Sequence, residues 1–277
     1  MKYIILGDGY IGNYLLKRLP NAEMYPSKIE TVETIKLLMS ARPDAILINC
    51  AGKTGKPNVD WCEDNKEITA QANVMLPIYI SEAMKELGYK YWIHIGSGCL
   101  YNGYGKIYSE TDPPDFYGSF YSRTKIYSQE ILSKHHNVCV LRIRMPIDEA
   151  LHRRSYVSKV VMYAKNDYPL FSLPNSMTAL EDLARVIEFV SADRITGTFN
   201  TVNEGTATIE QILAWYKQFK EPELEFRLVD IDSVLSTLKA GRSNCVLSTE
   251  KLKKFGYTMP KIEDRIISYL AKKGHKR

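Results

Sequence analysis

Gly7-Asp8-Gly9-Tyr10-Ile11-Gly12 decides the fold, because it joins two segments of different periodicity. The segment before it, Lys2–Leu6, is short and apolar like a buried strand, and Tyr10–Leu19 has the spacing of a helix. A GxGxxG pattern that ends a strand and opens a helix is typical of dinucleotide-binding folds. We therefore predict a dinucleotide-binding loop here, with Tyr10 and Ile11 among the contacting residues.

Each glycine of this loop has its own physical task. Gly7 permits a tight turn, Gly9 lets the backbone approach a pyrophosphate, and Gly12 allows the helix to pack closely on the strand. The helix N-terminus faces the pyrophosphate and favours its negative charge. A glycine-rich turn without a ligand is the alternative, and the position directly after the first strand favours the dinucleotide site.

Strand-like and helix-like segments alternate along most of the chain. Short apolar segments typical of buried strands recur at Glu23–Tyr25, Ala45–Cys50, Tyr91–Gly96, Val138–Arg144 and Gly197–Val202. Between them lie segments with helical spacing, namely Thr31–Ala41, Trp61–Leu87, Phe120–His136 and Ala179–Ala192. This alternation predicts an α/β fold with a doubly wound parallel sheet of the Rossmann type.

The pattern loosens after Pro146, where shorter elements are punctuated by Pro169, Pro174, Pro222 and Pro260. We predict that residues 1–146 and 179–202 form the dinucleotide-binding domain. Residues 147–178 and 203–277 would form a smaller C-terminal lobe that binds the substrate.

The composition restricts the class of protein. Of the 277 residues, 45% are hydrophobic, as in a soluble globular protein with a sizeable core. No apolar run approaches the roughly 20 residues of a membrane-spanning helix, and Met1 precedes a strand rather than a signal peptide. The net charge of +5 comes from scattered residues, so no nucleic-acid partner is expected. Five cysteines without a CxxC pair indicate a reduced, cytoplasmic setting, and we predict no metal site.

The end of the second strand predicts the choice of cofactor. NAD-selective sites usually carry an Asp or Glu there, which holds the ribose hydroxyls. In this chain Tyr25 is followed by Pro26-Ser27-Lys28, without an acid. This favours NADPH over NADH and places Ser27 and Lys28 beside the extra phosphate, with a plain surface role as the alternative for Lys28. A dinucleotide crossing the carboxyl ends of the strands would also pass over Asn49, Ala51 and Gly52.

Three residues have the chemistry of carbonyl reduction. Ser97 ends a predicted strand, and Tyr121 and Lys125 lie one turn apart on a predicted helix. A free tyrosine, with a pKa of about 10, is a poor base at neutral pH, and a nearby ammonium favours its phenolate. Ser97 would hold a ketone oxygen, Tyr121 would exchange a proton with it, and Lys125 would also contact the nicotinamide ribose. Three further YxxxK strings occur in the chain, but none follows a strand that ends in such a serine.

These motifs resemble those of the extended short-chain dehydrogenase/reductases over nearly the whole chain. Ser97-Gly98-Cys99-Leu100-Tyr101 matches the family's strand-end serine and following aromatic, and Thr178–Ala184 resembles its late helix. Arg242-Ser243-Asn244 resembles the diphosphate segment of dTDP-4-dehydrorhamnose reductases. A more specific resemblance, to the UDP-4-keto-6-deoxyglucose 3,5-epimerase/4-reductases that form the C-terminal half of plant UDP-rhamnose synthases, rests on Gly52–Glu63, Gly118–Ser122, Arg142–Pro146 and Pro174–Thr178.

The specific resemblance implies that UDP-4-keto-6-deoxy-D-glucose is converted to UDP-L-rhamnose by 3,5-epimerisation and NADPH-dependent 4-reduction. It also implies a homodimer and a substrate supplied by a UDP-glucose 4,6-dehydratase. By the same resemblance Arg144 belongs to the cofactor-binding residues, and the substrate is contacted by Lys53, Asn175, Thr178 and Arg242. The guanidinium of Arg242 would pair with the diphosphate. For Asn175 a structural role is an equal alternative.

Cys99 would separate an epimerase-reductase from a plain reductase. Hydrogens on the carbons beside a ketone are acidic, and inversion needs a base on one face and an acid on the other. A tuned thiol can serve as such a base, and Cys99 lies two residues from Ser97. GDP-fucose synthases, which also combine epimerisation with reduction, resemble this chain in having a cysteine at this place. Their partner acid is a histidine, whereas here we favour Lys159, on the predicted helix Arg153–Lys165, over His152.

Two other functions remain as alternatives. The first is a dTDP-4-dehydrorhamnose reductase without epimerase activity, and it applies if Cys99 is only a small buried filler, the usual role of a free cysteine. The second is a non-catalytic NADP-binding regulatory subunit, against which the complete set of Ser97, Tyr121 and Lys125 argues.

Overall fold

The computed structural model describes residues 1–26 and 28–272. Within this range, six strands form one parallel sheet in the order β2-β1-β3-β4-β5-β8. The strands are β1 (Lys2–Leu6), β2 (Ala22–Tyr25), β3 (Ala45–Asn49), β4 (Trp92–Ser97), β5 (Val138–Ile143) and β8 (Gly197–Asn200). The predicted α/β fold with a doubly wound parallel sheet is therefore confirmed.

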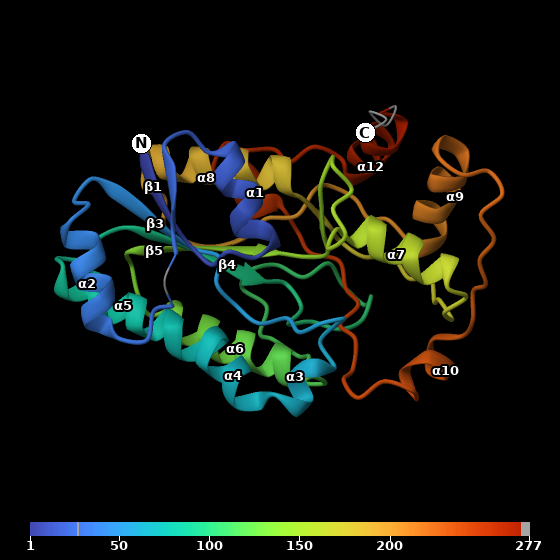
Figure 1. Ribbon diagram of the computed structural model, residues 1–277, viewed down its shortest axis with the longest axis horizontal. Helices are drawn as coiled ribbons and strands as arrows, with labels where there is room; N and C mark the ends of the chain where they lie inside the picture. Colours follow the sequence, from blue (N-terminus) through green and yellow to red (C-terminus); the bar gives the residue numbers. More distant parts are fainter. Residues whose placement is uncertain (27, 273–277) are drawn as a thin grey trace.

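Helices cover both faces of the sheet (Figure 1). One face is covered by α1 (Tyr10–Arg18) and α8 (Leu180–Ala192), and the other by α2 (Val32–Ser40), α5 (Leu76–Glu86) and α6 (Phe120–Leu132). The strands supply apolar side chains to both cores: in β3, Ile46 and Ile48 join one core and Leu47 joins the other. Such burial on both faces explains why the strands are continuous apolar runs rather than alternating ones.

The predicted continuous helix Trp61–Leu87 is wrong, because the structure divides this segment into shorter pieces. They are α3 (Trp61–Asp64), α4 (Lys66–Ala70), a π-helical turn η1 (Gln71–Met75) and α5. Asn65 interrupts the first turn, since its side-chain amide donates to the carbonyl of Trp61 at 2.9 Å and its backbone leaves helical geometry. Side chains that compete with the backbone in this way break helices.

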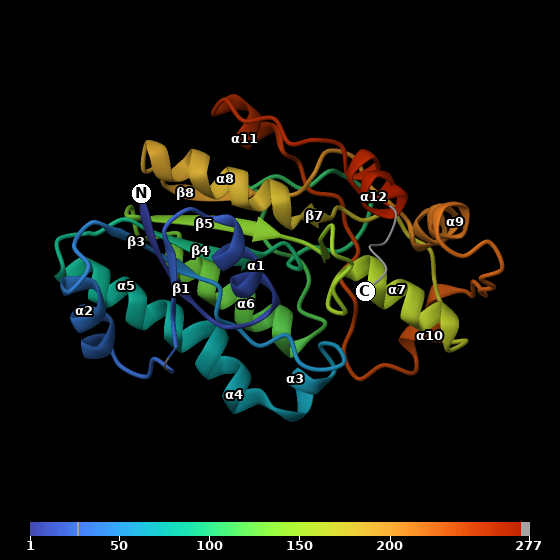
Figure 2. The ribbon, with the colours of Figure 1, turned by 45° about the horizontal axis from the view of Figure 1, so that its top comes forward.

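The chain after β5 builds a second cluster of elements, toward which the carboxyl ends of the strands point (Figure 2). It contains the short parallel pair β6 (Pro146–Ile147) and β7 (Thr178–Ala179), and the helices α7 (Tyr156–Lys165), α9 (Ile209–Phe219), α10 (Ile231–Leu235) and α12 (Ile262–Ala271). Apolar side chains of α7, α9 and α12 share one core. The short helix α11 (Glu250–Lys254) packs against β8 instead. The exact domain boundaries stay a prediction.

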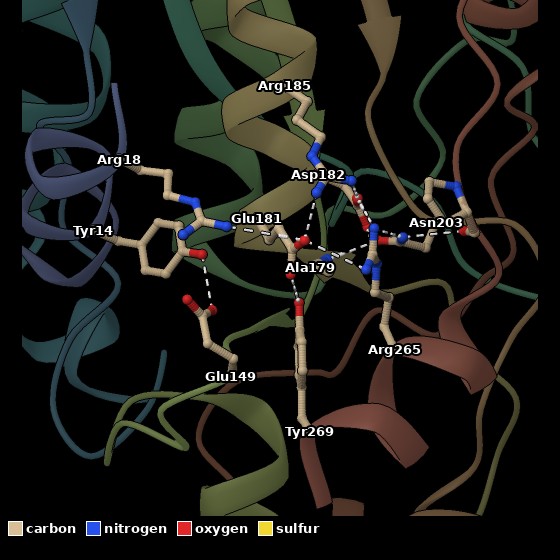
Figure 3. A network of polar contacts seen from close by, with 11 residues as sticks. Tyr14, Arg18, Glu149, Ala179, Glu181, Asp182, Arg185, Asn203, Arg265 and Tyr269 are labelled. Carbon is tan, nitrogen blue, oxygen red and sulfur yellow. Dashed lines mark hydrogen bonds and ion pairs between the residues drawn. The ribbon is translucent and has the colours of Figure 1, made fainter. Parts of the chain in front are cut away.

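A network of charged and polar side chains joins the two parts (Figure 3). Arg265 of α12 donates two hydrogen bonds to the carboxylate of Asp182 at the start of α8, at 2.8 and 2.6 Å. Asn203 donates to the same carboxylate at 2.6 Å, and Tyr269 donates to Glu181 at 3.3 Å. The C-terminal helix is thus fixed to α8. None of the helices in the described ranges is both long and apolar enough to cross a membrane.

Candidate active site

The glycine loop has the shape that a pyrophosphate requires. Gly7 has a φ of +97°, and a Cβ there would lie 2.6 Å from the backbone nitrogen of Ala51. A Cβ on Gly12 would collide with the carbonyl oxygen of Gly7, so α1 packs directly on the turn. By contrast, a Cβ on Gly9, the N-cap of α1, would meet no other atom of the described chain within 4 Å. The open face at Gly9, before a first helical turn without acidic residues, fits a bound anion.

This loop lies where the strand order reverses. β1 is flanked by β2 on one side and by β3 on the other, and ligands of open parallel sheets bind outside the carboxyl ends of the strands at such a point. The residues after Gly9 contact other parts of the chain: Ile11 packs on the core, and the ring of Tyr10 stacks on that of His152 at 4.8 Å. The hydroxyl of Tyr10 is buried and has no hydrogen-bond partner among the described residues.

The end of β2 holds the residues expected at the cofactor phosphate. Lys28 is exposed, and its ammonium lies 2.5 Å from the carboxylate of Glu30. Ser27 lies outside the described residues. The role predicted for Lys28 stays a prediction, and Glu30 is a counter-charge to Lys28 that the sequence pattern did not indicate.

The segment after β3 brings the glycine loop and the predicted catalytic lysine together. Asn49 accepts a hydrogen bond from the amide of Ala51 at 3.0 Å, which fixes the turn. A Cβ on Gly52 would lie 3.1 Å from Asn73 Oδ1 and 3.5 Å from Lys125 Nζ. The ammonium of Lys125 therefore lies against the backbone that a dinucleotide would cross.

Ser97, Tyr121 and Lys125 converge from two elements. Ser97 is the last residue of β4, and α6 begins at the N-cap Ser119, whose hydroxyl accepts a hydrogen bond from the amide of Ser122 at 3.0 Å. This cap fixes the first turn of α6, so that Tyr121 and Lys125 project from one face of it. The exposed fractions are 3% for Ser97, 8% for Tyr121 and 5% for Lys125, which shows that the three polar groups are enclosed.

Burial controls the protonation of these groups. It raises the pKa of Tyr121 above the ordinary tyrosine value, and a thiolate at Cys99 would raise it further, whereas a hydrogen bond with Ser97 lowers it. Burial lowers the pKa of Lys125 to about 8, against an effect of Cys99 in the opposite direction. Tyr121 is therefore a protonated acid at neutral pH, and Lys125 is a cation that loses its proton in the mildly alkaline range.

Cys99 lies in the same site. Its amide donates to the hydroxyl of Ser97 at 3.1 Å, and its side chain is half-buried rather than enclosed in the core. A charge on its sulfur acts on both Tyr121 and Lys125, although burial has the larger effect on each pKa. The sulfur is thus within electrostatic reach of the reducing groups.

Lys159 and His152, the two predicted acids, differ in environment. Lys159 is half-buried on α7, and burial followed by the charge of Arg154 lowers its pKa. The exposed His152 is engaged on both sides, since its ring stacks on Tyr10 and its Nδ1 accepts the amide of Arg154 at 3.1 Å. This difference favours Lys159 as the proton donor, a role that stays a prediction.

The residues predicted to bind substrate have well-defined protein contacts. Lys53 is exposed, and its amide donates to Asn73 at 2.8 Å. Asn175 and Thr178 are buried between the two parts of the chain. Arg242 forms a two-pronged ion pair with Asp60, at 2.9 and 3.1 Å. Their substrate contacts stay predictions.

Arg144, predicted among the cofactor-binding residues, directs its guanidinium to protein groups. Nη1 donates to the carbonyl of Gly98 at 3.0 Å and to the hydroxyl of Ser243 at 2.9 Å. Nη2 donates to Asn175 Oδ1 at 2.6 Å and to the carbonyl of Ser243 at 3.0 Å. A contact of Arg144 with the cofactor stays a prediction.

Two polar residues support the site without having been predicted from the sequence. Asn73, in the π-helical turn, binds the backbone of Lys53 from both its amide and its carbonyl group and also donates to Thr124 Oγ1 at 3.1 Å. Gln129 of α6 donates to the carbonyl of Ser97 at 3.0 Å. A signal existed for Gln129, which lies one helical turn after Lys125 on the same face. Among the described residues, no cluster of three or more His, Cys, Asp or Glu side chains could hold a metal ion.

Comparisons with known proteins identify relatives of this chain. A trifunctional UDP-glucose 4,6-dehydratase/UDP-4-keto-6-deoxy-D-glucose 3,5-epimerase/UDP-4-keto-L-rhamnose-reductase of Arabidopsis thaliana is 31% identical over 97% of this chain. The chain spans only 41% of that protein's length. A bifunctional dTDP-4-dehydrorhamnose 3,5-epimerase/dTDP-4-dehydrorhamnose reductase of the same plant is 33% identical over 83% of this chain and 77% of its own length.

Solved structures show the same architecture. The L780 UDP-rhamnose synthase of Acanthamoeba polyphaga mimivirus has a TM-score of 0.90 and 27% identity, over 98% of this chain and 99% of that chain. A dTDP-4-dehydrorhamnose reductase of Bacillus anthracis in complex with NADP has a TM-score of 0.83 at 18% identity, over 97% of this chain and 99% of that chain, a likeness of fold alone. The family model described as the RmlD substrate binding domain matches residues 1–274. The chain therefore belongs to the RmlD substrate binding domain family.

Proposed function

We propose that this protein is an NADPH-dependent 3,5-epimerase/4-reductase that converts UDP-4-keto-6-deoxy-D-glucose to UDP-L-rhamnose. The observation that carries the proposal is the presence of Cys99 in one site with Ser97, Tyr121 and Lys125. A reductase needs the last three only. The names of the plant and viral relatives, which include epimerase-reductases and a UDP-rhamnose synthase, support the same substrate class.

The reduction uses the enclosed groups at the end of β4 and the start of α6. NADPH, held by the glycine loop and the segment after β3, supplies the hydride when it is bound. Ser97 holds the ketone oxygen, and Tyr121 gives its phenolic proton to that oxygen as the new C–H bond forms. Lys125 stabilises the phenolate that Tyr121 becomes. The low dielectric of the enclosed site strengthens this charge interaction.

The epimerisation uses the same ketone as an electron sink. Cys99, as a thiolate, removes a proton from a carbon beside the ketone. The electron pair of that C–H bond forms a C=C bond, and the π pair of the C=O bond moves to the oxygen. The hydroxyl groups of Ser97 and Tyr121 stabilise the resulting enolate by hydrogen bonds. Lys159 then protonates the carbon on the opposite face, and solvent restores the proton of Lys159 and removes that of Cys99. The same groups act in turn at both carbons that flank the ketone.

Deuterium labelling tests the proposal. Purified protein is given UDP-4-keto-6-deoxy-D-glucose and NADPH in D2O, and the product is analysed by NMR. We expect UDP-L-rhamnose with deuterium on both carbons beside the former ketone. Turnover that requires an added 3,5-epimerase would establish a dTDP-4-dehydrorhamnose reductase type of activity, without epimerisation. Binding of NADPH without any turnover would point to a regulatory subunit.

Cys99→Ala separates the two reactions. We expect the variant to incorporate no deuterium while it still reduces a 4-keto-L-rhamnose nucleotide that was epimerised beforehand. Cys139→Ala is the matched control, because Cys139 is a fully buried cysteine in the core of the sheet. Equal loss of both activities in Cys99→Ala would assign Cys99 a structural role. Lys159→Met should abolish inversion at the carbons while Cys99 still exchanges their protons with solvent on its own face, whereas His152→Ala should retain inversion.

The remaining parts of the proposal concern partners. The substrate is the product of a UDP-glucose 4,6-dehydratase. The name of the trifunctional plant relative includes this activity in the same chain. Arg242 would exchange its partner Asp60 for the diphosphate, and Asn175 and Thr178 would support the sugar side of the site. We also propose a homodimer that pairs α4–α5 and α6 across a two-fold axis. Light scattering on the purified protein would reveal a monomer if this is wrong.

A further inference from the structure

Arg144 is a buried cation that the proposed reaction steps do not use. It follows β5, its exposed fraction is 1%, and no carboxylate of the described residues forms an ion pair with it within 4.0 Å. Its Nε–H is buried and has no hydrogen-bond partner among the described residues. Burial of a charge without a counter-charge costs free energy, so this arrangement requires a reason.

The contacts of Arg144 connect three segments that are far apart in the sequence. Its guanidinium binds the carbonyl of Gly98, the side chain of Asn175, and both the hydroxyl and carbonyl of Ser243. The hydroxyl of Ser243 in turn donates to the carbonyl of Tyr101 at 2.6 Å. The segment 97–101 is thereby tied to the C-terminal segment at two points, one of them between Ser97 and Cys99.

Gly98 is fitted to this arginine. A Cβ on Gly98 would lie 2.8 Å from Cγ and 3.1 Å from Cδ of Arg144, and 2.5 Å from Cδ1 of Leu247. The aliphatic stem of Arg144 therefore lies across the residue that separates Ser97 from Cys99, while its head binds the carbonyl of the same residue. The two functional side chains thus flank the residue that Arg144 contacts.

We propose that Arg144 is a positioning residue that fixes Ser97 and Cys99 relative to the substrate-binding segment Arg242–Cys245, so that one bound pose of the sugar serves both reactions. This inference rests on the proposed function and assigns Arg144 to the protein frame of the site rather than to the cofactor. Its uncompensated charge also favours anions nearby. Burial raises the pKa of Tyr121 and of Cys245, and the charge of Arg144 opposes the increase in both.

Arg144→Met, Arg144→Lys and Arg144→Ala test this role. Loss of the guanidinium hydrogen bonds should raise KM and lower kcat for reduction about 10²-fold. This is the scale expected when a reacting group is misplaced by roughly 1 Å. It should also lower the incorporation of deuterium relative to reduction, because Cys99 and Ser97 are then no longer both in place for one bound pose of the sugar. A lysine offers a single point charge and should recover only part of the activity. Millimolar guanidinium, but not methylammonium, should restore activity to Arg144→Ala.

Hydrogen exchange provides a readout that does not depend on turnover. Amides of residues 97–101 should exchange faster in Arg144→Met and Arg144→Lys than in wild type. Arg265→Met is the matched control, since it breaks a buried arginine contact at α8. The faster exchange that follows from its lower global stability should be spread over the chain and not concentrated in residues 97–101. If wild type does not turn over the substrate, the proposed function fails, and the exchange data still decide the role of Arg144. Unchanged exchange in 97–101, or an activity loss that only follows the folded fraction, would overturn the inference.

Discussion

Two arginines that pack between the two parts of the chain have opposite electrostatic environments. Arg265 is paired with a carboxylate that is itself fully buried, that of Asp182, through hydrogen bonds of 2.8 and 2.6 Å (Figure 3). Arg144 is buried more deeply but is bound only by neutral groups, with hydrogen bonds of 2.6 to 3.0 Å. Both join segments that are far apart in the sequence, yet only one of them is neutralised.

This difference separates a structural joint from a reaction site. The two charges of a pair such as Arg265–Asp182 offset each other, so the pair attracts a ligand only weakly. Removal of one partner leaves the other charge buried and unpaired, so the effect of such a substitution is on stability. An arginine without a counter-charge leaves its field available to anions, including the phenolate, thiolate and enolate of the proposed steps. The predictions below test whether stability and chemistry are divided between the two regions in this way.

The largest effect on stability is expected at the neutralised pair. Arg265→Met leaves the carboxylate of Asp182 buried without its main partner, and such losses cost about 3–5 kcal/mol. We expect about 3 kcal/mol, the lower end of this range, because Arg185 lies 3.7 Å from the same carboxylate and partly compensates. The free energy of unfolding in urea measures the loss, and kcat per folded molecule should be unchanged.

Arg185→Met is the control for this variant. The side chain of Arg185 is 51% exposed, so its ion pairs are solvated and should contribute less than about 1 kcal/mol. Equal losses in the two variants would show that the buried geometry of Arg265 has no special importance, and the contrast with Arg144 would disappear.

At the reaction site we expect a large loss of activity and a small loss of stability. Tyr121→Phe removes the proposed proton donor and should lower kcat for reduction about 10²–10⁴-fold. The free energy of unfolding should change by less than about 1 kcal/mol, since only one hydroxyl and its contact with Ser97 are lost. NADPH oxidation followed by absorbance, together with urea unfolding, measures both quantities. Retained reduction would remove Tyr121 from its proposed role.

Two glycine substitutions compare the arginine-held segment with the glycine loop. Gly98→Ala places a methyl group against Leu247 and the stem of Arg144, and overpacking of this kind costs about 1–3 kcal/mol. We expect both reactions to be lost with it. Gly9→Ala adds its methyl group to open space, so stability should stay within about 0.5 kcal/mol while NADPH binding weakens. A stability loss at Gly9 as large as that at Gly98 would contradict this comparison.

The sequence predicted what local patterns determine. The glycine loop, the parallel sheet and the set Ser97, Tyr121 and Lys125 follow from spacing along the chain, because strand, turn and helix preferences act over a few residues. The break in the predicted helix Trp61–Leu87 does not, since it depends on a polar residue, Asn65, whose side chain competes with the helix backbone.

The contacts of Arg144 lay beyond the reach of sequence patterns for a related reason. Ser243, which receives two of its hydrogen bonds, is 99 residues away in the chain, and Gly98 is 46 residues away. No periodicity connects positions at such separations. The family resemblance assigned Arg144 to the cofactor and Arg242 to the substrate diphosphate, and only packing distinguishes the arginine without an acid from the one that pairs with Asp60.

The pH dependence of Lys125 is the smallest effect, and it has opposite signs for activity and stability. Burial lowers its pKa to about 8 from the ordinary 10.5. Activity requires the cation, because a neutral amine no longer stabilises the phenolate of Tyr121. We therefore expect kcat/KM for reduction to fall as pH rises through about 8, by up to about tenfold per pH unit. A profile that is flat to higher pH would contradict the assignment.

The contribution of Lys125 to stability should change in the other direction. Below pH 8 the lysine is charged in both the folded and the unfolded chain, and the full cost of burying that charge is present. As pH rises above about 8, the folded state releases the proton while the unfolded state keeps it up to about 10.5. The unfolded state then binds more protons, so this group favours folding increasingly as pH rises. Subtracting the unfolding free energies of Lys125→Met from those of wild type isolates the contribution from other titrating groups. A difference that rises between pH 8 and 10 while kcat/KM falls would show one residue whose charge serves the reaction at the expense of the fold, which is the relation inferred for Arg144.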